Sequence, residues 1–347
     1  MFKKLTGLTL ATIFVTGCSV TPAKVALQKN SPTHKVNVYS VIEQEQLNAL
    51  YPIQDSSAVS AQFGLVGALV GGAIDGSANN SAAETAEENL VAIRYELKDL
   101  DFDQIFEEEI NKKLSGNVNV DKVRTLKSKD AVKDELKTGE VYLELDTQYM
   151  MDMDFRTPFI VTNVKIAEKN NKKSTSSDKV LYKNTFTYFG TTLPVPVKEL
   201  NPELEAMVRA DWKAQPYSVR SDKVAKSNYK KRLKAARRAN NPELDFDEAN
   251  VISANAWSTE YKEELQNNLR KGIQNLFTLI ASDIKDSTDP LSYAKKGVTM
   301  KGYPKNHKSV VVVETEEMQV IRFTEGTRAG AICAMPNIAS TEKLVCL

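Results

Sequence analysis

Residues 141–149 read Val-Tyr-Leu-Glu-Leu-Asp-Thr-Gln-Tyr, with apolar side chains at every second position as far as Leu145 and again at Tyr149. A period of two is the pattern of a strand that buries one face and exposes the other. The same strand signal recurs over residues 159–166 and 180–189. Three such stretches joined by polar segments predict an antiparallel meander.

Helical periodicity lies on both sides of these strands. From Ala254 to Ile280, large apolar side chains recur every three or four residues, which predicts one long helix lying across the sheet. Ser81 and Glu84 form a capping box that opens another helix, and a further helix is expected from about Asp103. The predicted fold class is α+β, with an antiparallel sheet covered by helices.

The N-terminus has the organisation of a secretory signal peptide. A basic start is followed by an apolar run over residues 5–15, which covers only about half of a hydrocarbon core of about 30 Å. The run ends in Val15-Thr16-Gly17-Cys18, which resembles the lipobox of bacterial lipoproteins. The resemblance implies that residues 1–17 are removed as a lipoprotein signal peptide, that Cys18 carries lipid, and that residues 18–33 form a lipidated tether.

The residue after the lipidated cysteine acts as an address in this family. Ser19 stands where an aspartate usually retains lipoproteins of diderm bacteria in the inner membrane. The resemblance therefore implies an outer-membrane lipoprotein, held to the membrane by its N-terminal lipid, with its folded part facing the periplasm or exposed at the surface. Without residues 1–17 the chain is close to neutral, so its overall charge does not indicate nucleic acid as a partner.

Two further cysteines, Cys333 and Cys346, lie near the C-terminus, where short strand signals replace the helical pattern. A β module over residues 300–347 is expected to bury little apolar surface by itself, and an oxidising compartment favours a disulfide between these two cysteines. Their spacing excludes a Cys-x-x-Cys redox motif. The sequence thus predicts an α+β envelope domain over residues 34–290, followed by a small disulfide-stapled C-terminal β module.

Residues 58–74 form the most apolar stretch after the signal and carry Gly67-x-x-x-Gly71, a motif of close helix packing. A core helix, a membrane-contacting or self-associating helix and an ordered loop are the alternatives for this segment. Its length lies at the lower limit for a membrane span and it includes Ser60 and Gln62, which favours the core helix.

Motifs that carry metal chemistry are weak in this chain. Asp99-x-Asp101-x-Asp103 begins like a calcium-binding loop but lacks the glycine and the glutamate that such a loop needs further on. Asp101 and Gln104 make a helix-capping pair instead. Methionines at positions 150, 151 and 153 offer a ligand type that Cu(I) accepts, yet no histidine lies near them.

Catalytic and cofactor motifs are weak as well. Ser-x-x-Lys recurs in the chain without its companion motifs, the chain has two histidines, and it contains no phosphate-binding glycine loop or dinucleotide-binding pattern. We therefore predict no catalytic residue, no metal site and no cofactor, and a protein that is not an enzyme.

The most distinctive motif is a basic stretch within residues 220–240. Nine basic residues occur there with Asp222 as the single acid, and interspersed alanines favour a helix with a thin apolar side. The candidate partners are envelope proteins with acidic surfaces, lipopolysaccharide phosphates and anionic lipid headgroups. The alternatives are a solvated helix and an internal match to the acidic helices at 84–109. The basic residues are Arg220, Lys223, Lys226, Lys230, Lys231, Arg232, Lys234, Arg237 and Arg238.

Two functions are compatible with these features. The favoured one is a non-enzymatic outer-membrane lipoprotein that acts as a structural or assembly partner in the bacterial cell envelope. The alternative is a periplasmic binding or carrier protein that holds a lipid or another small molecule between the sheet and the long helix. A deep apolar cavity would indicate the carrier, and a shallow surface that meets envelope components would indicate the structural partner.

Overall fold

The sheet of the computed structural model is built around the predicted meander. β4 (Val141–Met151), β5 (Pro158–Glu168) and β6 (Lys179–Phe189) are antiparallel neighbours in that order. The alternation along β4 sorts its side chains as expected, because Leu143 and Leu145 are fully buried while Glu144 and Asp146 are half-buried. The predicted meander is confirmed.

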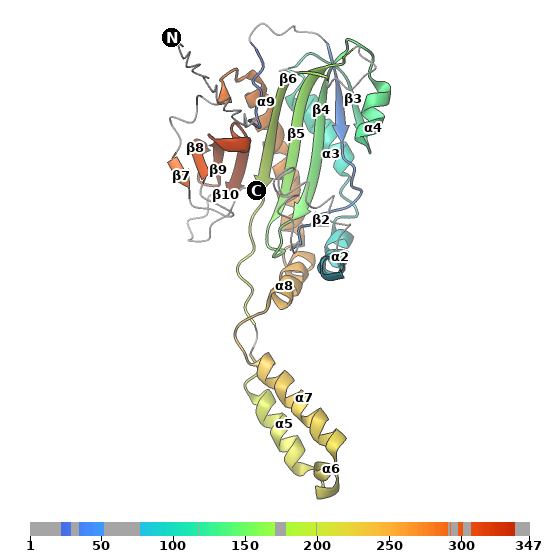
Figure 1. The fold of residues 1–347 in the computed structure, drawn as a ribbon, viewed down its shortest axis with the longest axis vertical. Helices are drawn as coiled ribbons and strands as arrows, with labels where there is room; N and C mark the ends of the chain where they lie inside the picture. The colour runs from blue at the N-terminus through green and yellow to red at the C-terminus, as the bar shows by residue number, and fades with distance from the viewer. Residues whose placement is uncertain are drawn as a thin grey trace, which may run out of the picture.

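The structure describes residues 22–28, 35–51, 77–116, 118–170, 178–198, 200–290, 292, 298–300 and 307–336. Within these ranges ten strands form one sheet in the order β3-β1-β4-β5-β6-β10-β9-β8-β7, and β2 (Asn48–Ala49) pairs with β4. Figure 1 shows this sheet in the main body of the molecule, with a pair of helices far below it. The expected signal peptide, Cys18 and the glycine-rich stretch 58–74 lie outside the described residues. Among the described helices, none is long and apolar enough to cross a membrane.

The sheet is mixed, which corrects the expectation of an antiparallel sheet. β1 (Val36–Val41) lies between β3 (Val120–Leu126) and β4 and is parallel to both, and β10 (Ile332–Pro336) is parallel to β6. Parallel neighbours need long crossover connections. The connection from β1 to β3 contains α2 (Ser77–Glu96) and α3 (Phe102–Lys113). The expectation was wrong because alternation shows which face a strand buries and says nothing about its direction.

The C-terminal strands extend the main sheet instead of forming a separate module. β7 (Val298–Met300), β8 (His307–Glu314) and β9 (Met318–Phe323) continue from β10 as antiparallel neighbours. Because β10 also pairs with β6, the C-terminal strands share the hydrophobic core of the main sheet. Ile332 of β10, for example, packs in the main hydrophobic cluster. Cys333 is buried on β10, whereas Cys346 lies outside the described residues, so the disulfide between them stays a prediction.

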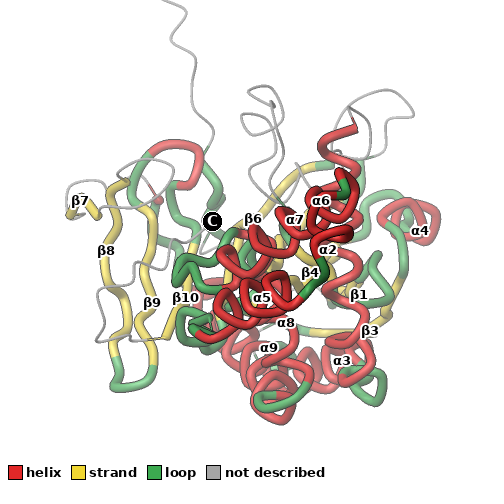
Figure 2. Tube along the Cα trace, turned by 90° about the horizontal axis from the view of Figure 1, so that it is seen from below, coloured by secondary structure: helices red, strands yellow, loops and turns green. Residues whose placement is uncertain are grey.

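The predicted long helix is two helices, α8 (Phe246–Ser258) and α9 (Lys262–Lys285). The hydroxyls of Ser258 and Thr259 donate to the carbonyl oxygen of Asn255, at 3.0 and 2.7 Å, and these local bonds compete with continuation of the helix. α9 still covers β5 and β6, on the same side of the sheet as α3 (Figure 2). Its fully buried inward side chains are Leu265, Leu269, Ile273, Leu276, Phe277 and Ile280.

The two acidic helices differ in how well their starts were predicted. α2 is already helical at Ser77, so Ser81 lies inside it, since the alanines around Ser81 have the highest helix propensity. α3 begins after Asp101, whose side chain accepts from the backbone N–H of Gln104 at 3.0 Å, which confirms the capping pair. The short α4 (Lys129–Glu135) and the 3₁₀ turn Gly326–Arg328 complete the body.

Candidate functional site

A helical hairpin carries the predicted basic residues. α5 (Glu203–Ala214) and α7 (Lys223–Ala239) pack against each other and are joined by α6 (Tyr217–Ser221). Trp212 stacks on Tyr229 with ring centroids 4.6 Å apart, and Val208 and Ala236 are buried between the helices. Figure 1 shows this unit well separated from the sheet. We call residues 203–239 the basic hairpin.

The local sequence explains why α7 begins where it does. The Asp222 side chain accepts from the backbone N–H of Ala225 at 2.7 Å, which caps the first turn of the helix. From there to residue 239 the chain consists mainly of lysine, arginine and alanine, which are strong helix formers. The predicted helix over the basic stretch is therefore present, with Arg220 on α6 and the other eight basic residues on α7.

A neck, formed by residues 190–198 and by residues 240–248, connects the basic hairpin to the body. Residues 190–198 leave β6 and include two prolines, which stiffen the chain. The Lys198 Nζ lies 3.0 Å from the Glu248 Oε2 of α8 and donates to the backbone oxygen of Arg238 at 3.1 Å. Lys198 thus ties together the descending chain, the end of α7 and the start of α8. This tie restricts the direction of the hairpin.

Three of the nine predicted basic residues form ion pairs with acidic residues of the hairpin and the neck. Arg232 lies 2.9 Å from the Asp211 Oδ2, and Arg237 lies 3.2 Å from the Glu205 Oε1. Arg238 pairs with Asp245 and Glu248 in the neck. None of these acids belongs to α2 or α3, so the alternative of an internal match to the acidic helices does not account for these ion pairs. Within the described chain, no ion pair involves Arg220, Lys223, Lys226, Lys230, Lys231 or Lys234.

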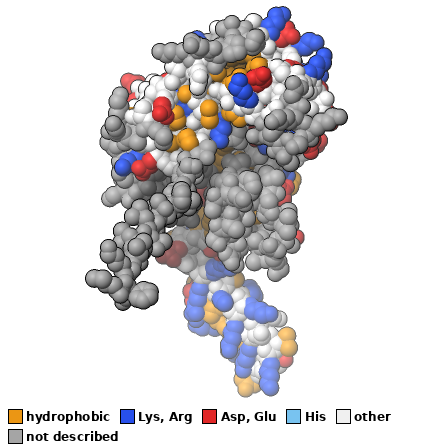
Figure 3. Space-filling model, turned by 45° about the horizontal axis from the view of Figure 1, so that its top comes forward, with side chains coloured by type: hydrophobic (Ala, Val, Ile, Leu, Met, Phe, Trp, Pro, Cys, Tyr) orange, Lys and Arg blue, Asp and Glu red, His pale blue; other side chains and the backbone are white. Residues whose placement is uncertain are grey.

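The unpaired lysines gather on one face of α7. Lys223, Lys226, Lys230 and Lys234 recur every three or four residues along one flank of α7 and are all exposed. We call these four residues the lysine stripe. Figure 3 shows lysine and arginine side chains crowded along this part of the molecule. The whole hairpin holds eleven basic against four acidic residues, so it is strongly positive.

Large apolar side chains are exposed at the far end of the hairpin. Tyr217 is 79% exposed, Val219 39% and Val224 67%, and they lie on α6 and the first turn of α7. We call these three residues the apolar tip. Arg220 and Lys223 lie between them in the sequence. The end of the hairpin therefore presents apolar and basic side chains together.

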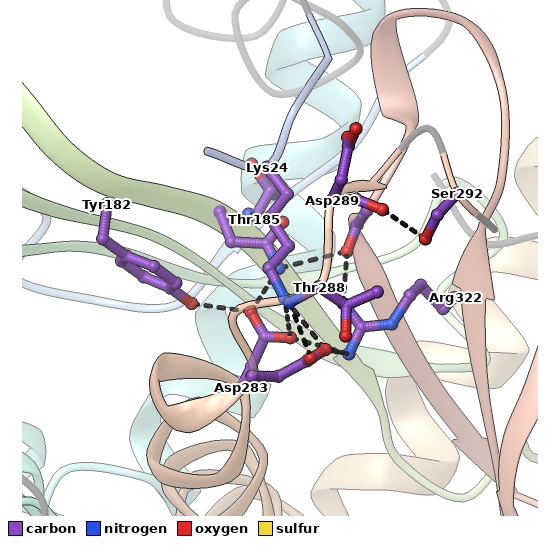
Figure 4. A network of polar contacts seen from close by, with 11 residues as sticks. Lys24, Tyr182, Thr185, Asp283, Thr288, Asp289, Ser292 and Arg322 are labelled. Carbon is purple, nitrogen blue, oxygen red and sulfur yellow. Dashed lines mark hydrogen bonds and ion pairs between the residues drawn. The ribbon is translucent and has the colours of Figure 1, made fainter. Parts of the chain in front are cut away.

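A second concentration of charge lies inside the body and was missed by sequence analysis. The Lys24 Nζ lies 3.0 Å from both the Asp283 Oδ1 and the Asp286 Oδ2, and the Arg322 Nη2 lies 2.6 and 3.4 Å from the same two oxygens. Lys24 is 0% exposed. Figure 4 shows the side chains of Lys24, Asp283 and Arg322 converging beside Tyr182. We call Lys24, Asp283, Asp286 and Arg322 the buried ion cluster.

Neutral groups complete the coordination of Asp283. The hydroxyl of Tyr182 and the side-chain amide of Asn184 donate to its Oδ2 at 2.7 and 2.8 Å. Burial, and then the charge of Asp283, raise the pKa of Tyr182 well above its usual value, so the phenol keeps its proton and remains a donor at neutral pH. Both oxygens of Asp283 are occupied by donors from the protein itself. The cluster therefore fixes the positions of the chain segments that it joins, and it leaves no oxygen of Asp283 free to react.

The buried ion cluster holds the segment 22–28 against the sheet. Val25 exchanges backbone hydrogen bonds with Lys183 of β6, at 2.8 and 3.1 Å, and the backbone N–H of Lys24 donates to Ala329 at 3.1 Å. Gly330 has a positive φ of 90°, and a Cβ there would lie 2.2 Å from the Cβ of Lys24. Only glycine fits at this point of contact.

No protein-family model, curated protein or solved structure matches this chain. No enzyme family or homologue is therefore identified for it.

The weaker motifs of the sequence have structural explanations. Asp101 caps α3, and Asp103 pairs with Lys127 at 2.7 Å. Met150 and Met151 are buried side chains of the hydrophobic core. In the part of the chain that the structure describes, no group of three or more His, Cys, Asp and Glu side chains is placed to hold a metal ion.

One carboxyl with a perturbed pKa also has a structural explanation. Asp152 lies in the turn between β4 and β5, where burial first, and then the neighbouring Asp154, raise its pKa well above the usual value. Its Oδ1 accepts from the backbone N–H groups of Arg156 and Thr157, at 2.8 and 3.0 Å. These bonds close the turn. We assign Asp152 to the turn and not to a reactive site.

Proposed function

We propose that this protein is an outer-membrane lipoprotein, anchored through Cys18, that acts without catalysis as a structural or assembly partner in the bacterial cell envelope. The observation that carries the proposal is the basic hairpin, a strongly positive unit that a stiff neck holds away from the folded body. A helix pair that buries so little of its own surface contributes little to the core. Its position and charge are those of a contact surface for an anionic partner.

The docked segment 22–28 supports the proposed anchor. Lys24 is the sixth residue after Cys18, and six residue steps of extended chain reach at most about 21 Å. The buried ion cluster keeps segment 22–28 bound to the body. A lipid on Cys18 would therefore hold the body close to the membrane surface. Replacing Cys18 by alanine should abolish acyl labelling and processing. A variant still labelled with palmitate would contradict the anchor.

A crosslinking experiment tests the role of the hairpin. A photoreactive amino acid at Tyr217, on the hairpin, is compared with one at Tyr95, a 63% exposed tyrosine of α2 on the body. In intact envelopes we expect adducts with an envelope component from position 217 and few or none from position 95. Adducts from position 95 alone, or none from either position, would contradict the proposed contact surface.

Packing between α9 and the sheet is evidence against the carrier alternative. Gly272 of α9 lies so close to β6 that a Cβ there would meet the Tyr188 ring at 2.8 Å and the Ile160 side chain at 3.1 Å. A ligand between these layers would have to separate them. One described pocket, lined by Leu50, Met153 and others at the end of the sheet, measures about 30 Å³, room for about one water molecule.

We also propose the disulfide between Cys333 and Cys346. Cys333 is buried at the strand that joins the C-terminal strands to β6, so a bridge there would fasten the last residues of the chain to the sheet. Closing a loop of this size is worth about 3 kcal/mol in the chain-entropy model. Mass spectrometry of the oxidised protein after alkylation should find both thiols protected, and two alkylated thiols would contradict the bridge.

A further inference from the structure

The arginines and the lysines of the basic hairpin differ in whether they form ion pairs. Arg209 pairs with Glu205 at 2.6 Å, and the three arginines of α7 are likewise committed to acids of the hairpin and neck. The hairpin cations for which the described chain shows no ion pair are six lysines, Lys213 of α5 and five on α7, together with Arg220. Arginine recognises single carboxylates and phosphates through a rigid fork, whereas lysine acts as a mobile, hydrated point charge. The free charge of this hairpin is thus of the kind that responds to a diffuse anionic surface.

The apolar tip adds an independent observation. Tyr217, Val219 and Val224 are exposed at the end of the hairpin, beside Arg220 and Lys223. Apolar and aromatic side chains that lie beside basic residues are typical of a surface that enters the boundary between lipid headgroups and acyl chains, where long basic side chains extend to the phosphates. An acidic protein surface would satisfy the lysines but would leave these three apolar side chains without a partner.

From these two observations we infer that the basic hairpin binds the headgroup region of an anionic lipid bilayer. The apolar tip enters the interface, and the lysine stripe, about 17 Å long at about 1.5 Å per residue, lies along the phosphates. The inference rests on the proposed function in one respect, because it names the partner of the same contact surface. It does not depend on the lipid at Cys18.

The test uses the full chain with Cys18→Ala, which removes the acyl anchor, and vesicle flotation as the measurement. We expect binding to vesicles that contain phosphatidylglycerol and none to pure phosphatidylcholine. Changing the lysine stripe to glutamine (K223Q, K226Q, K230Q and K234Q) should weaken binding by about 100-fold or more, since each lysine near an anionic surface contributes about a factor of five. The matched control changes four exposed lysines of the body and should leave binding unchanged: K122Q, K262Q, K271Q and K285Q.

A second variant separates insertion from simple charge attraction. Serine at Tyr217, Val219 and Val224 keeps every charge and removes only the apolar tip. This variant should bind normally at low salt but lose binding at ionic strengths above about 0.15 M, where the parent still holds through its inserted side chains. Unfolding curves of each variant check that the exposed substitutions leave the fold intact.

The outcomes separate the two proposals. If the parent does not bind anionic vesicles while position 217 still crosslinks to an envelope protein, the lipid inference is wrong and the proposed function stands. If neither vesicle binding nor crosslinks are found, both are wrong. If the body control weakens binding as much as the lysine stripe does, attraction is not localised to the hairpin and the inference is wrong.

Discussion

The buried ion cluster and the basic hairpin use the same charged residue types in opposite ways. In the cluster, two cations meet two carboxylates, and neutral donors occupy the remaining oxygen positions of Asp283. In the hairpin, eleven basic residues face four acids, and most of the surplus is in water. Burial makes every uncompensated charge costly, whereas water tolerates an excess. A region with many unpaired charges is therefore suited to bind a partner outside the chain. A region whose charges are paired stabilises the folded chain.

The largest effect is expected from Asp283→Asn. This change leaves Lys24 and Arg322 buried with Asp286 as their remaining carboxylate, so the free energy of unfolding should fall by about 3–5 kcal/mol. Urea unfolding followed by circular dichroism measures the loss.

The matched control for that change is Asp211→Asn in the hairpin. Asp211 pairs with Arg232 at a similar distance, but both side chains are more than half exposed, and exposed pairs contribute about 0.2–1 kcal/mol. Similar losses from the two substitutions would contradict the contrast between the regions.

A second prediction concerns the contact between segment 22–28 and Gly330, two residues after the 3₁₀ turn. Gly330→Ala introduces a methyl group that overlaps the Cβ of Lys24 at a backbone φ of 90°. The segment must move, so the backbone N–H groups of Lys24 and Val25 should exchange with solvent much faster.

Gly139→Ala provides the control for this substitution. Gly139 also has a positive φ, 77°, but nothing lies within 4 Å of a Cβ there. Both variants carry left-handed strain of about 1–2 kcal/mol, and Gly330→Ala adds the clash. Unchanged hydrogen exchange of residues 22–28 in Gly330→Ala would show that the cluster does not hold this segment.

The same contrast explains what could be read from the sequence. The meander was predictable because period-two alternation records burial directly, and α7 was predictable from composition and charge. The parallel neighbours of β1 and β10 were not, because side-chain periodicity carries no strand direction. The break before α9 depends on two hydroxyl groups, Ser258 and Thr259, whose local bonds no apolar pattern reveals.

The buried ion cluster shows a more specific limit. Lys24 belongs to a polar stretch expected to be a tether, and nothing around it indicates burial. Asp283 did leave a signal, since it stands three residues after Ile280 and one before Ile284, in the apolar register of α9. A charge in an otherwise apolar face predicts a buried partner, but the partner lies 259 residues away and only the fold identifies it.

A third prediction tests the neck that separates the regions. Lys198→Met removes the tie to Glu248 and to the backbone of Arg238. Because the neck contributes little to the core, stability should change by about 1 kcal/mol or less. The distribution of distances between dyes at Lys213 and Lys271, measured by single-molecule energy transfer, should nevertheless broaden. Lys226→Met is the control, and equal broadening in both variants would contradict a specific tie at Lys198.

The smallest effect on stability is expected from the lysine stripe itself. Its four lysines make no ion pair in the described chain, so changing them to glutamine should alter the free energy of unfolding by less than about 0.5 kcal/mol. Changing Arg232, Arg237 and Arg238 instead removes pairs that link α7 to α5 and to the neck, so these changes should loosen the hairpin. Hydrogen exchange across residues 203–239 distinguishes the two sets, because arginine substitutions should speed exchange and lysine substitutions should not. If the lysine set loosens the hairpin as much as the arginine set, the lysines stabilise the helix pair, and the surplus charge no longer argues for an external partner.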